Sequence, residues 1–287
     1  MSDEIKLGIV ADEISRDFRE AVRIGSQVGL RRYEVRFLKT GRAPQCDHSE
    51  LLQVERIRDG EGIEITALSP GLFKYTNDAI GFAREMAEVF PRAIELAVRW
   101  NLPALITFGF QKPAATEENA DLVSSADPPE HIIEWLSEAA ATASAANIKL
   151  LIEPEPICWA DSGAATAQLI RRVGSAALGI NYDPANAAWM LRRDPLDEFG
   201  EVVPLIGNVH VKDQLDAPLG SGPPRWVVPG EGMIDYRAHF AALQRIKYAG
   251  LISLEPHMDG SLETIQKCKQ AVEQLWNTAL AGHDTFS

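Results

Sequence analysis

Four residues that can bind a divalent cation close short apolar runs in the second half of the chain. They are Glu153, Asp183, His210 and Glu255, and Leu150-Leu151-Ile152-Glu153 is one such run. Carboxylate and imidazole ligands with an open position suit Mn²⁺, Mg²⁺, Co²⁺ or Zn²⁺, and the lack of thiolate ligands argues against a closed structural zinc site. One polar residue at the end of an apolar run often only begins a loop. Four in successive units indicate a shared metal site.

The segments that must position these residues alternate between short β-branched runs and longer amphipathic ones, which is typical of repeated βα units. The expected strands are residues 5–10, 32–37, 63–68, 104–108, 149–153, 177–183, 206–211 and 251–255. The expected helices are residues 18–28, 49–59, 79–100, 129–146, 164–173, 236–246 and 261–280, with a weaker one at 197–203. Eight units close a barrel, and the first strand lacks the GxGxxG turn of a dinucleotide-binding sheet. We therefore expect one (β/α)₈ barrel domain over residues 1–287, with the four strand ends meeting at its mouth.

The stretch 213–235 is the main irregularity, because it holds four prolines and several glycines. It is expected to be a long loop after the seventh strand, on the active-site face. Within it, Arg225 either clamps a phosphate or carboxylate of the substrate or is solvated. Trp226 in this loop and Trp159 after the fifth strand are well placed to cover a sugar ring.

Further candidates adjoin the strand ends. Lys212 either donates to a substrate oxygen or forms an ion pair at the rim. Glu34 and Arg36 alternate with Val35 and so share one side of their strand, where they contact substrate or pair internally. His257 lies two residues beyond Glu255 and should project to the same side, toward the substrate or a metal ligand.

The composition narrows the class of partner. A formal charge of −13 and a pI near 5.0 argue against binding nucleic acid, which relies on Lys and Arg. The sequence shows neither a secretory leader nor an apolar run long enough to span a membrane, so a cytoplasmic location is expected. Three scattered cysteines are expected to be reduced thiols. A small molecule is the expected partner, and assembly into a homo-oligomer stays open.

Over nearly its whole length the sequence resembles the sugar phosphate isomerase/epimerase family with a xylose isomerase-like TIM barrel. The resemblance is carried by Ile152-Glu153-Pro154, Asn181-Tyr182-Asp183-Pro184-Ala185-Asn186, His210-Val211-Lys212-Asp213, Pro229-Gly230-Glu231-Gly232 and Leu254-Glu255-Pro256-His257. It implies one metal ion held by Glu153, Asp183, His210 and Glu255. Some relatives have a further ligand His where this chain has Asn186, which favours a single metal and leaves Asn186 as a substrate contact. Ketose 3-epimerases of the family have a substrate-binding Glu where this chain has Trp159, which argues against a free-ketose 3-epimerase.

The chemistry that the resemblance implies is proton transfer next to a carbonyl. A cation bridging the carbonyl and a neighbouring hydroxyl stabilises an enediolate, and a carboxylate removes the proton. With Glu153 and Glu255 as the acid–base pair, the reaction is an isomerisation or epimerisation of a sugar, sugar phosphate or related polyol ketone. Two alternatives stay open. One is a metal-dependent dehydratase or lyase of an inosose or 3-keto-glycoside, and the other is a non-catalytic carbohydrate-binding barrel.

Overall fold

The structure, a computed structural model, describes residues 5–114, 127–216 and 224–280. Eight parallel strands close into a barrel in the order β1-β12-β9-β8-β7-β6-β5-β2. They are β1 (Leu7–Val10), β2 (Arg32–Val35), β5 (Glu64–Leu68), β6 (Ala104–Phe108), β7 (Lys149–Glu153), β8 (Leu178–Tyr182), β9 (Ile206–Val211) and β12 (Ile252–Leu254). The predicted (β/α)₈ TIM barrel is therefore confirmed, and the predicted ranges contain or match the observed barrel strands.

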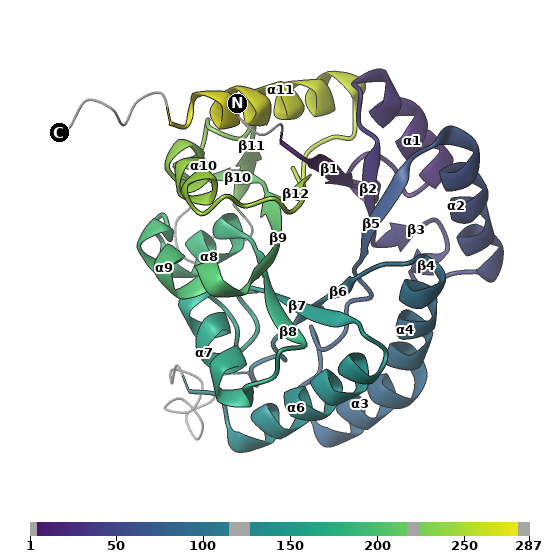
Figure 1. Cartoon of the computed structure of the whole chain (residues 1–287), viewed down its shortest axis with the longest axis vertical. Coiled ribbons are helices and arrows are strands. Elements are labelled where there is room, and N and C mark those ends of the chain that lie inside the picture. The colour runs from purple at the N-terminus through teal and green to yellow at the C-terminus, as the bar shows by residue number, and fades with distance from the viewer. Residues whose placement is uncertain (1–4, 115–126, 217–223, 281–287) are drawn as a thin grey trace.

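Helices form an outer ring around the strands (Figure 1). They are α1 (Phe18–Gln27), α2 (His48–Glu61), α3 (Ala79–Arg84), α4 (Phe90–Arg99), α6 (Glu130–Ala145), α7 (Gly163–Val173), α8 (Pro184–Leu191), α9 (Phe199–Val202), α10 (Tyr236–Arg245) and α11 (Leu262–Thr278). A π-helical turn at Glu85–Val89 joins α3 to α4, so the predicted helix at 79–100 is nearly continuous. The weak candidate at 197–203 is the short α9, flanked by 3₁₀ turns at Leu196–Glu198 and Val203–Leu205.

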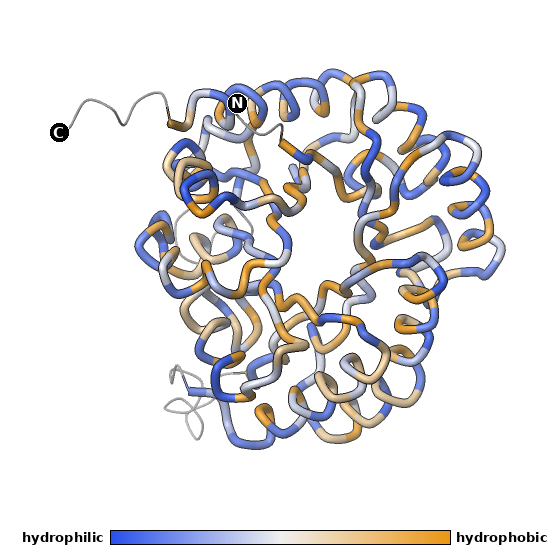
Figure 2. Tube along the Cα trace, in the orientation of Figure 1, coloured by the Kyte–Doolittle hydropathy of each residue, from blue (hydrophilic) through white to orange (hydrophobic). Residues whose placement is uncertain are grey.

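The helices pack on the barrel through apolar stripes. In α4, for example, Phe90, Ala93 and Ala97 are spaced by three or four residues and are fully buried. Figure 2 shows hydrophilic residues along the outer edge of the ring and hydrophobic residues toward the strands. Burying a large apolar side chain contributes about 1.5–3 kcal/mol. None of the helices within the three described ranges is both long and apolar enough to cross a bilayer.

Three features at the mouth of the barrel differ from the sequence-based expectation. The predicted second strand stops at Val35, and the chain continues into a hairpin of β3 (Phe37–Leu38) and β4 (Gly41–Arg42). The expected loop at 213–235 contains an antiparallel pair, β10 (Asp213–Leu215) and β11 (Arg225–Val227). Finally, α8 begins directly after β8, with Asp183 as its N-cap and Pro184 in its first turn.

Candidate functional site

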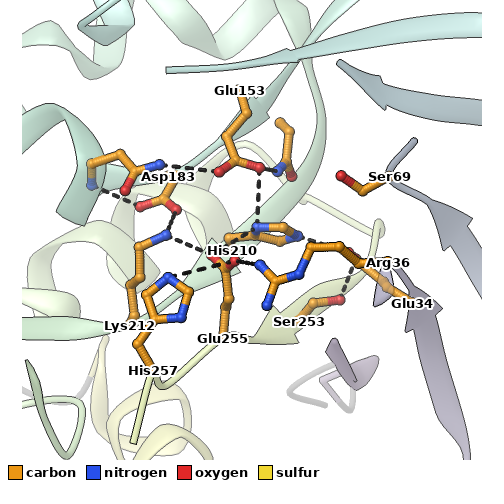
Figure 3. Close-up of polar contacts among 12 residues, drawn as sticks. Glu34, Arg36, Ser69, Glu153, Asp183, His210, Lys212, Ser253, Glu255 and His257 are labelled. Atoms are coloured by element: carbon orange, nitrogen blue, oxygen red, sulfur yellow. Dashed lines mark hydrogen bonds and ion pairs between the residues drawn. The ribbon is translucent and has the colours of Figure 1, made fainter. Parts of the chain in front are cut away.

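The four predicted metal ligands meet at the mouth of the barrel. Glu153 ends β7, Asp183 follows β8, His210 lies in β9 and Glu255 follows β12. One oxygen or nitrogen atom of each lies within 4.8 Å of those of the other three. All four side chains are buried and point toward one another from their separate strands (Figure 3). The convergence follows from the parallel barrel, in which all carboxyl ends share one rim.

The two nitrogens of the His210 ring have different environments. Nε2 lies 2.7 Å from Oε2 of Glu34. Nδ1 lies 3.4 Å from Oε2 of Glu153 and 3.3 Å from Oε2 of Glu255, yet it is buried and has no well-formed hydrogen bond among the described residues. With Glu34 accepting from Nε2, the Nδ1 lone pair faces the carboxylates, an arrangement that suits a divalent cation. The residues present therefore fit the metal that the family resemblance implies.

Glu34 also lines the cavity, and its carboxylate is held by protein groups. Besides His210, its carboxylate accepts hydrogen bonds from Asn208 Nδ2 at 2.9 Å and from Ser253 Oγ at 2.5 Å. Burial disfavours its charged form, but His210 and these hydrogen bonds outweigh burial and lower the Glu34 pKa. Of the two roles considered for Glu34, the geometry gives the internal pair.

Amide groups hold Glu153. Asn186 Nδ2 donates to its Oε1 at 3.0 Å, and Asn181 Nδ2 donates to its Oε2 at 2.8 Å. Burial raises the pKa of this carboxyl, with Glu255 adding to the effect and His210 opposing it. Asn186 also donates to the Pro154 carbonyl, and its backbone N–H donates to Oδ1 of Asp183. The predicted substrate contact Asn186 therefore lines the cavity and holds two of the predicted metal ligands, Glu153 and Asp183.

Glu255 is held by positively charged side chains, whereas Glu153 is held by neutral amides. Arg36 Nη1 donates to its Oε1, and Lys212 Nζ donates to its Oε2 at 2.5 Å. Burial would raise the pKa of Glu255, but the charges of Lys212, His257, His210 and Arg36 together hold it well below the ordinary range. The two candidate proton carriers thus differ in their readiness to take up a proton.

The two basic candidates beside Glu255 are also paired with protein carboxylates. Arg36 reaches Asp12 and Glu13 in addition to Glu255. Lys212 is fully buried rather than at the rim, and its Nζ also contacts Asp183. The surrounding carboxylates more than offset burial and raise the Lys212 pKa, so the residue is a cation at neutral pH.

A cavity of about 260 Å³ opens above the ligands and is lined by both polar and aromatic residues. Of the remaining candidates, Trp226 and His257 line it, and their rings meet edge to face with centroids 4.9 Å apart. Trp159 does not line it, because its side chain is buried in the hydrophobic core, with Lys112 Nζ 5.5 Å from the centroid of its ring. Arg225 is exposed on β11 and is not among the residues that line the cavity. The geometry brings neither Trp159 nor Arg225 to the metal ligands.

Several polar residues of the site were not singled out from the sequence. Asn181, Asn208 and Ser253 each precede a metal ligand by two residues, and all three are buried and hydrogen-bonded to Glu153 or Glu34. Their sequence positions predict this placement, because residues two apart in a strand face the same side. Asp213 is another case: it accepts backbone N–H groups from Gln214, Gly230, Gly232 and Ile234 and so fixes the turn after β11.

Comparisons with known proteins agree with this architecture. The family model described as xylose isomerase-like TIM barrel matches residues 22–278. A search of curated protein sequences gives no match. Among solved structures, the IOLI protein with a bound zinc atom has a TM-score of 0.72 at 19% identity, covering 96% of this chain and 99% of that one.

Two further solved structures have the same fold. An L-ribulose 3-epimerase has a TM-score of 0.69 at 18% identity, with 99% of this chain and 100% of the other covered. The probable 3-DHS dehydratase AsbF from Bacillus anthracis has a TM-score of 0.69 at 18% identity, with 96% and 99% covered. Structural similarity at such identities shows a shared fold, and the family model covers most of the sequence. The chain belongs to the xylose isomerase-like TIM barrel family.

Proposed function

We propose that the protein is a divalent-metal-dependent isomerase or epimerase of a sugar, sugar phosphate or related polyol ketone. The observation that carries this proposal is the convergence of Glu153, Asp183, His210 Nδ1 and Glu255 at the base of a cavity of small-molecule size. A metal bound by these residues would supply positive charge beside the carbonyl and hydroxyl oxygens where negative charge develops during proton abstraction. Mn²⁺, Mg²⁺, Co²⁺ and Zn²⁺ all suit this donor set.

The two glutamates are the proposed proton carriers. Glu153 is the better base of the pair, because burial raises the pKa of its carboxyl and the two asparagines fix its oxygens. Glu255 keeps its negative charge beside Lys212 and Arg36. The proton that it returns to the other face must therefore come from the Lys212 ammonium, which donates to its Oε2 at 2.5 Å and is then left neutral until the proton taken up by Glu153 is redistributed. Removal of a proton on one face and return on the other inverts one carbon, whereas transfer between neighbouring carbons interconverts an aldose and a ketose.

Lys212 is proposed to donate a hydrogen bond to a substrate oxygen. Its ammonium is buried, lines the cavity and lies between Asp183 and Glu255, next to the place where the reacting carbon must sit. Trp226 and His257 at the cavity wall are proposed to contact the carbon chain of the substrate. The zinc of the IOLI structure and the epimerase activity named for another relative of the same fold support this reading.

Proton exchange tests the proposal directly. Metal-loaded protein is incubated in D₂O with D-fructose, D-fructose 6-phosphate and D-xylulose 5-phosphate, and loss of C–H signals next to the carbonyl is followed by NMR. We expect exchange in the wild type, and none with Glu153→Gln or Glu255→Gln. Glu64→Gln is the matched control, since Glu64 is exposed at the amino end of β5, at the opposite end of the barrel.

Two results would overturn the proposal. Undiminished exchange in both glutamine variants would remove the acid–base pair. An unsaturated product absorbing in the ultraviolet, without a new sugar isomer, would instead assign the site to a dehydratase, the activity named for one of the similar structures.

A further inference from the structure

The basic residues around the cavity differ in whether an acid neutralises them. Arg36, Lys74, Lys212 and His257 all line the cavity and all form ion pairs with carboxylates: Arg36 with Asp12, Glu13 and Glu255, Lys74 with Glu155, Lys212 with Asp183 and Glu255, and His257 with Glu13. Arg42 lines the same cavity and has no carboxylate partner in the part of the chain that the structure describes.

The Arg42 side chain is held in place by neutral groups. Its Nε donates to the Ser69 carbonyl and its Nη2 to Ser69 Oγ, both at 2.9 Å. Its guanidinium carbon lies 4.9 Å from the centroid of the Phe37 ring. Nη1 is left without a hydrogen-bond partner among the described residues. The guanidinium is therefore oriented in advance and keeps donors for another group.

Gly71 makes room for this arrangement. A Cβ atom on Gly71 would lie 2.8 Å from both Cζ and Nε of Arg42, and the backbone of Gly71 has a φ of +79°. A larger residue at this position would meet both strain and a clash with the guanidinium. The β5–α3 connection is thus shaped around Arg42.

The charge of Arg42 is only partly compensated by the protein. Burial and the nearby Arg36 lower its pKa to about 10, which leaves it protonated at neutral pH. Arg42 is half-buried and forms no ion pair within the described residues; withdrawing such a charge from water is costly, and a bound anion would relieve that cost. A carboxylate or a phosphate matches the fork of guanidinium donors.

Position in the barrel connects Arg42 with the reaction site. Arg42 lies in the hairpin that follows β2, and Ser69 follows β5, whereas the metal ligands come from β7, β8, β9 and β12 in the other half of the ring. In the view of Figure 3, Ser69 lies across Glu153 and His210 from Lys212. From this geometry we infer that the substrate carries an anionic group, a carboxylate or a phosphate, which Arg42 binds while the carbonyl end faces the metal ligands. The inference rests on the proposed function for the carbonyl end.

Binding of three sugars that differ at one carbon tests the inference. D-glucose, D-glucuronate and D-glucose 6-phosphate share their first five carbons, so the end that faces the metal ligands stays constant. Isothermal titration calorimetry on the Mn²⁺-loaded wild type is expected to show at least one anionic sugar binding roughly tenfold or more tightly than glucose, as suits a charge-assisted hydrogen bond. The tighter of the two anionic sugars identifies the group as carboxylate or phosphate.

The variants make the result specific to Arg42. Arg42→Gln is expected to remove the preference for the anionic sugar, with Arg42→Met, also neutral, as a second variant if the first does not fold. Arg225→Gln, a change in an exposed arginine outside the cavity lining, should keep it. Three results would overturn the inference. The wild type could bind the three sugars equally, it could bind neither anionic sugar, or the Arg42 variants could keep the preference for the anionic sugar.

The outcome is separable from that of the proposed function. An Arg42-dependent preference without any proton exchange in D₂O would keep the anion site and remove the isomerase assignment. Proton exchange in a neutral ketose, without tighter binding of an anionic sugar, would keep the isomerase assignment and remove the anion site.

Discussion

Oε2 of Glu34 lies 2.7 Å from Nε2 of His210, and this contact decides which ring nitrogen faces the metal ligands. A carboxylate that accepts from one ring nitrogen holds the other in its unprotonated form and orients it. Asn208 and Ser253 hold Glu34 in turn, so the acceptor of the Nε2 hydrogen bond is itself fixed in place.

Glu34→Gln is therefore expected to weaken binding of Mn²⁺ by about 10- to 100-fold, because the amide holds the required tautomer less firmly. Competition with a chromophoric chelator measures the affinity. Glu64→Gln, the same change at an exposed residue of β5, should leave it unchanged. Equal affinities in the two variants would contradict the role assigned to Glu34.

Asn186→Ala is expected to slow proton exchange by about tenfold or more while changing metal affinity far less. The substitution removes the donor to Glu153 Oε1, but Asp183 keeps its hydrogen bond because the backbone N–H of residue 186 donates it. A preorganised base loses rate when its orientation is lost. Exchange by NMR and metal titration on the same samples separate the two effects, and an unchanged exchange rate would show that Glu153 needs no such support.

Asp213→Asn is expected to lower the free energy of unfolding by about 1–3 kcal/mol. Oδ2 of Asp213 accepts the N–H groups of Gly230 and Gly232, so the amide nitrogen of an asparagine at that position would face two donors. With the amide turned over, its nitrogen would instead face the N–H donors of Gln214 and Ile234. Urea denaturation measures the change. Asp59→Asn on the exposed face of α2 is the control. A loss equal to that of the control would mean that the turn does not depend on the carboxylate.

The stability of the protein in acid is expected to depend on Asp194. Burial would raise its pKa, but the hydrogen bond and charge of His239 and two backbone N–H groups outweigh burial and lower it. A folded-state pKa below the unfolded one means that this contribution is present above about pH 4 and is lost as the pH falls through the folded value. Asp194→Asn should therefore unfold more easily at pH 7, with the difference from wild type shrinking toward pH 3. A difference in urea midpoints that stays constant over this range would contradict the prediction.

The barrel and the convergence of the four predicted ligands could be anticipated because both follow from regular patterns. Alternating βα segments specify the fold, and a parallel barrel brings every strand end to one rim, so Glu153, Asp183, His210 and Glu255 had to meet if the strands were placed correctly. The buried Asn208 and Ser253 were accessible by the same reasoning, since each lies two residues before a ligand.

Other parts of the site had no such signal. Arg42 enters the cavity on a hairpin whose turn, Lys39-Thr40, has none of the Asn-Gly or Asp-Gly character that marks hairpins. The partners of Arg36 come from the segment after β1 and from Glu255, which only the closed ring brings together. Trp159 follows β7 as expected, but its ring packs into the core, and sequence position after a strand does not fix that direction.

Crystals grown with Mn²⁺ and measured at a wavelength where manganese scatters anomalously would show whether the four strand-end residues hold one divalent cation. We expect one anomalous peak within bonding distance of Glu153, Asp183, Glu255 and the Nδ1 atom of His210, and no peak in crystals of His210→Ala. The absence of a peak at this position in the wild type, with Lys212 still bridging Asp183 and Glu255, would contradict this expectation.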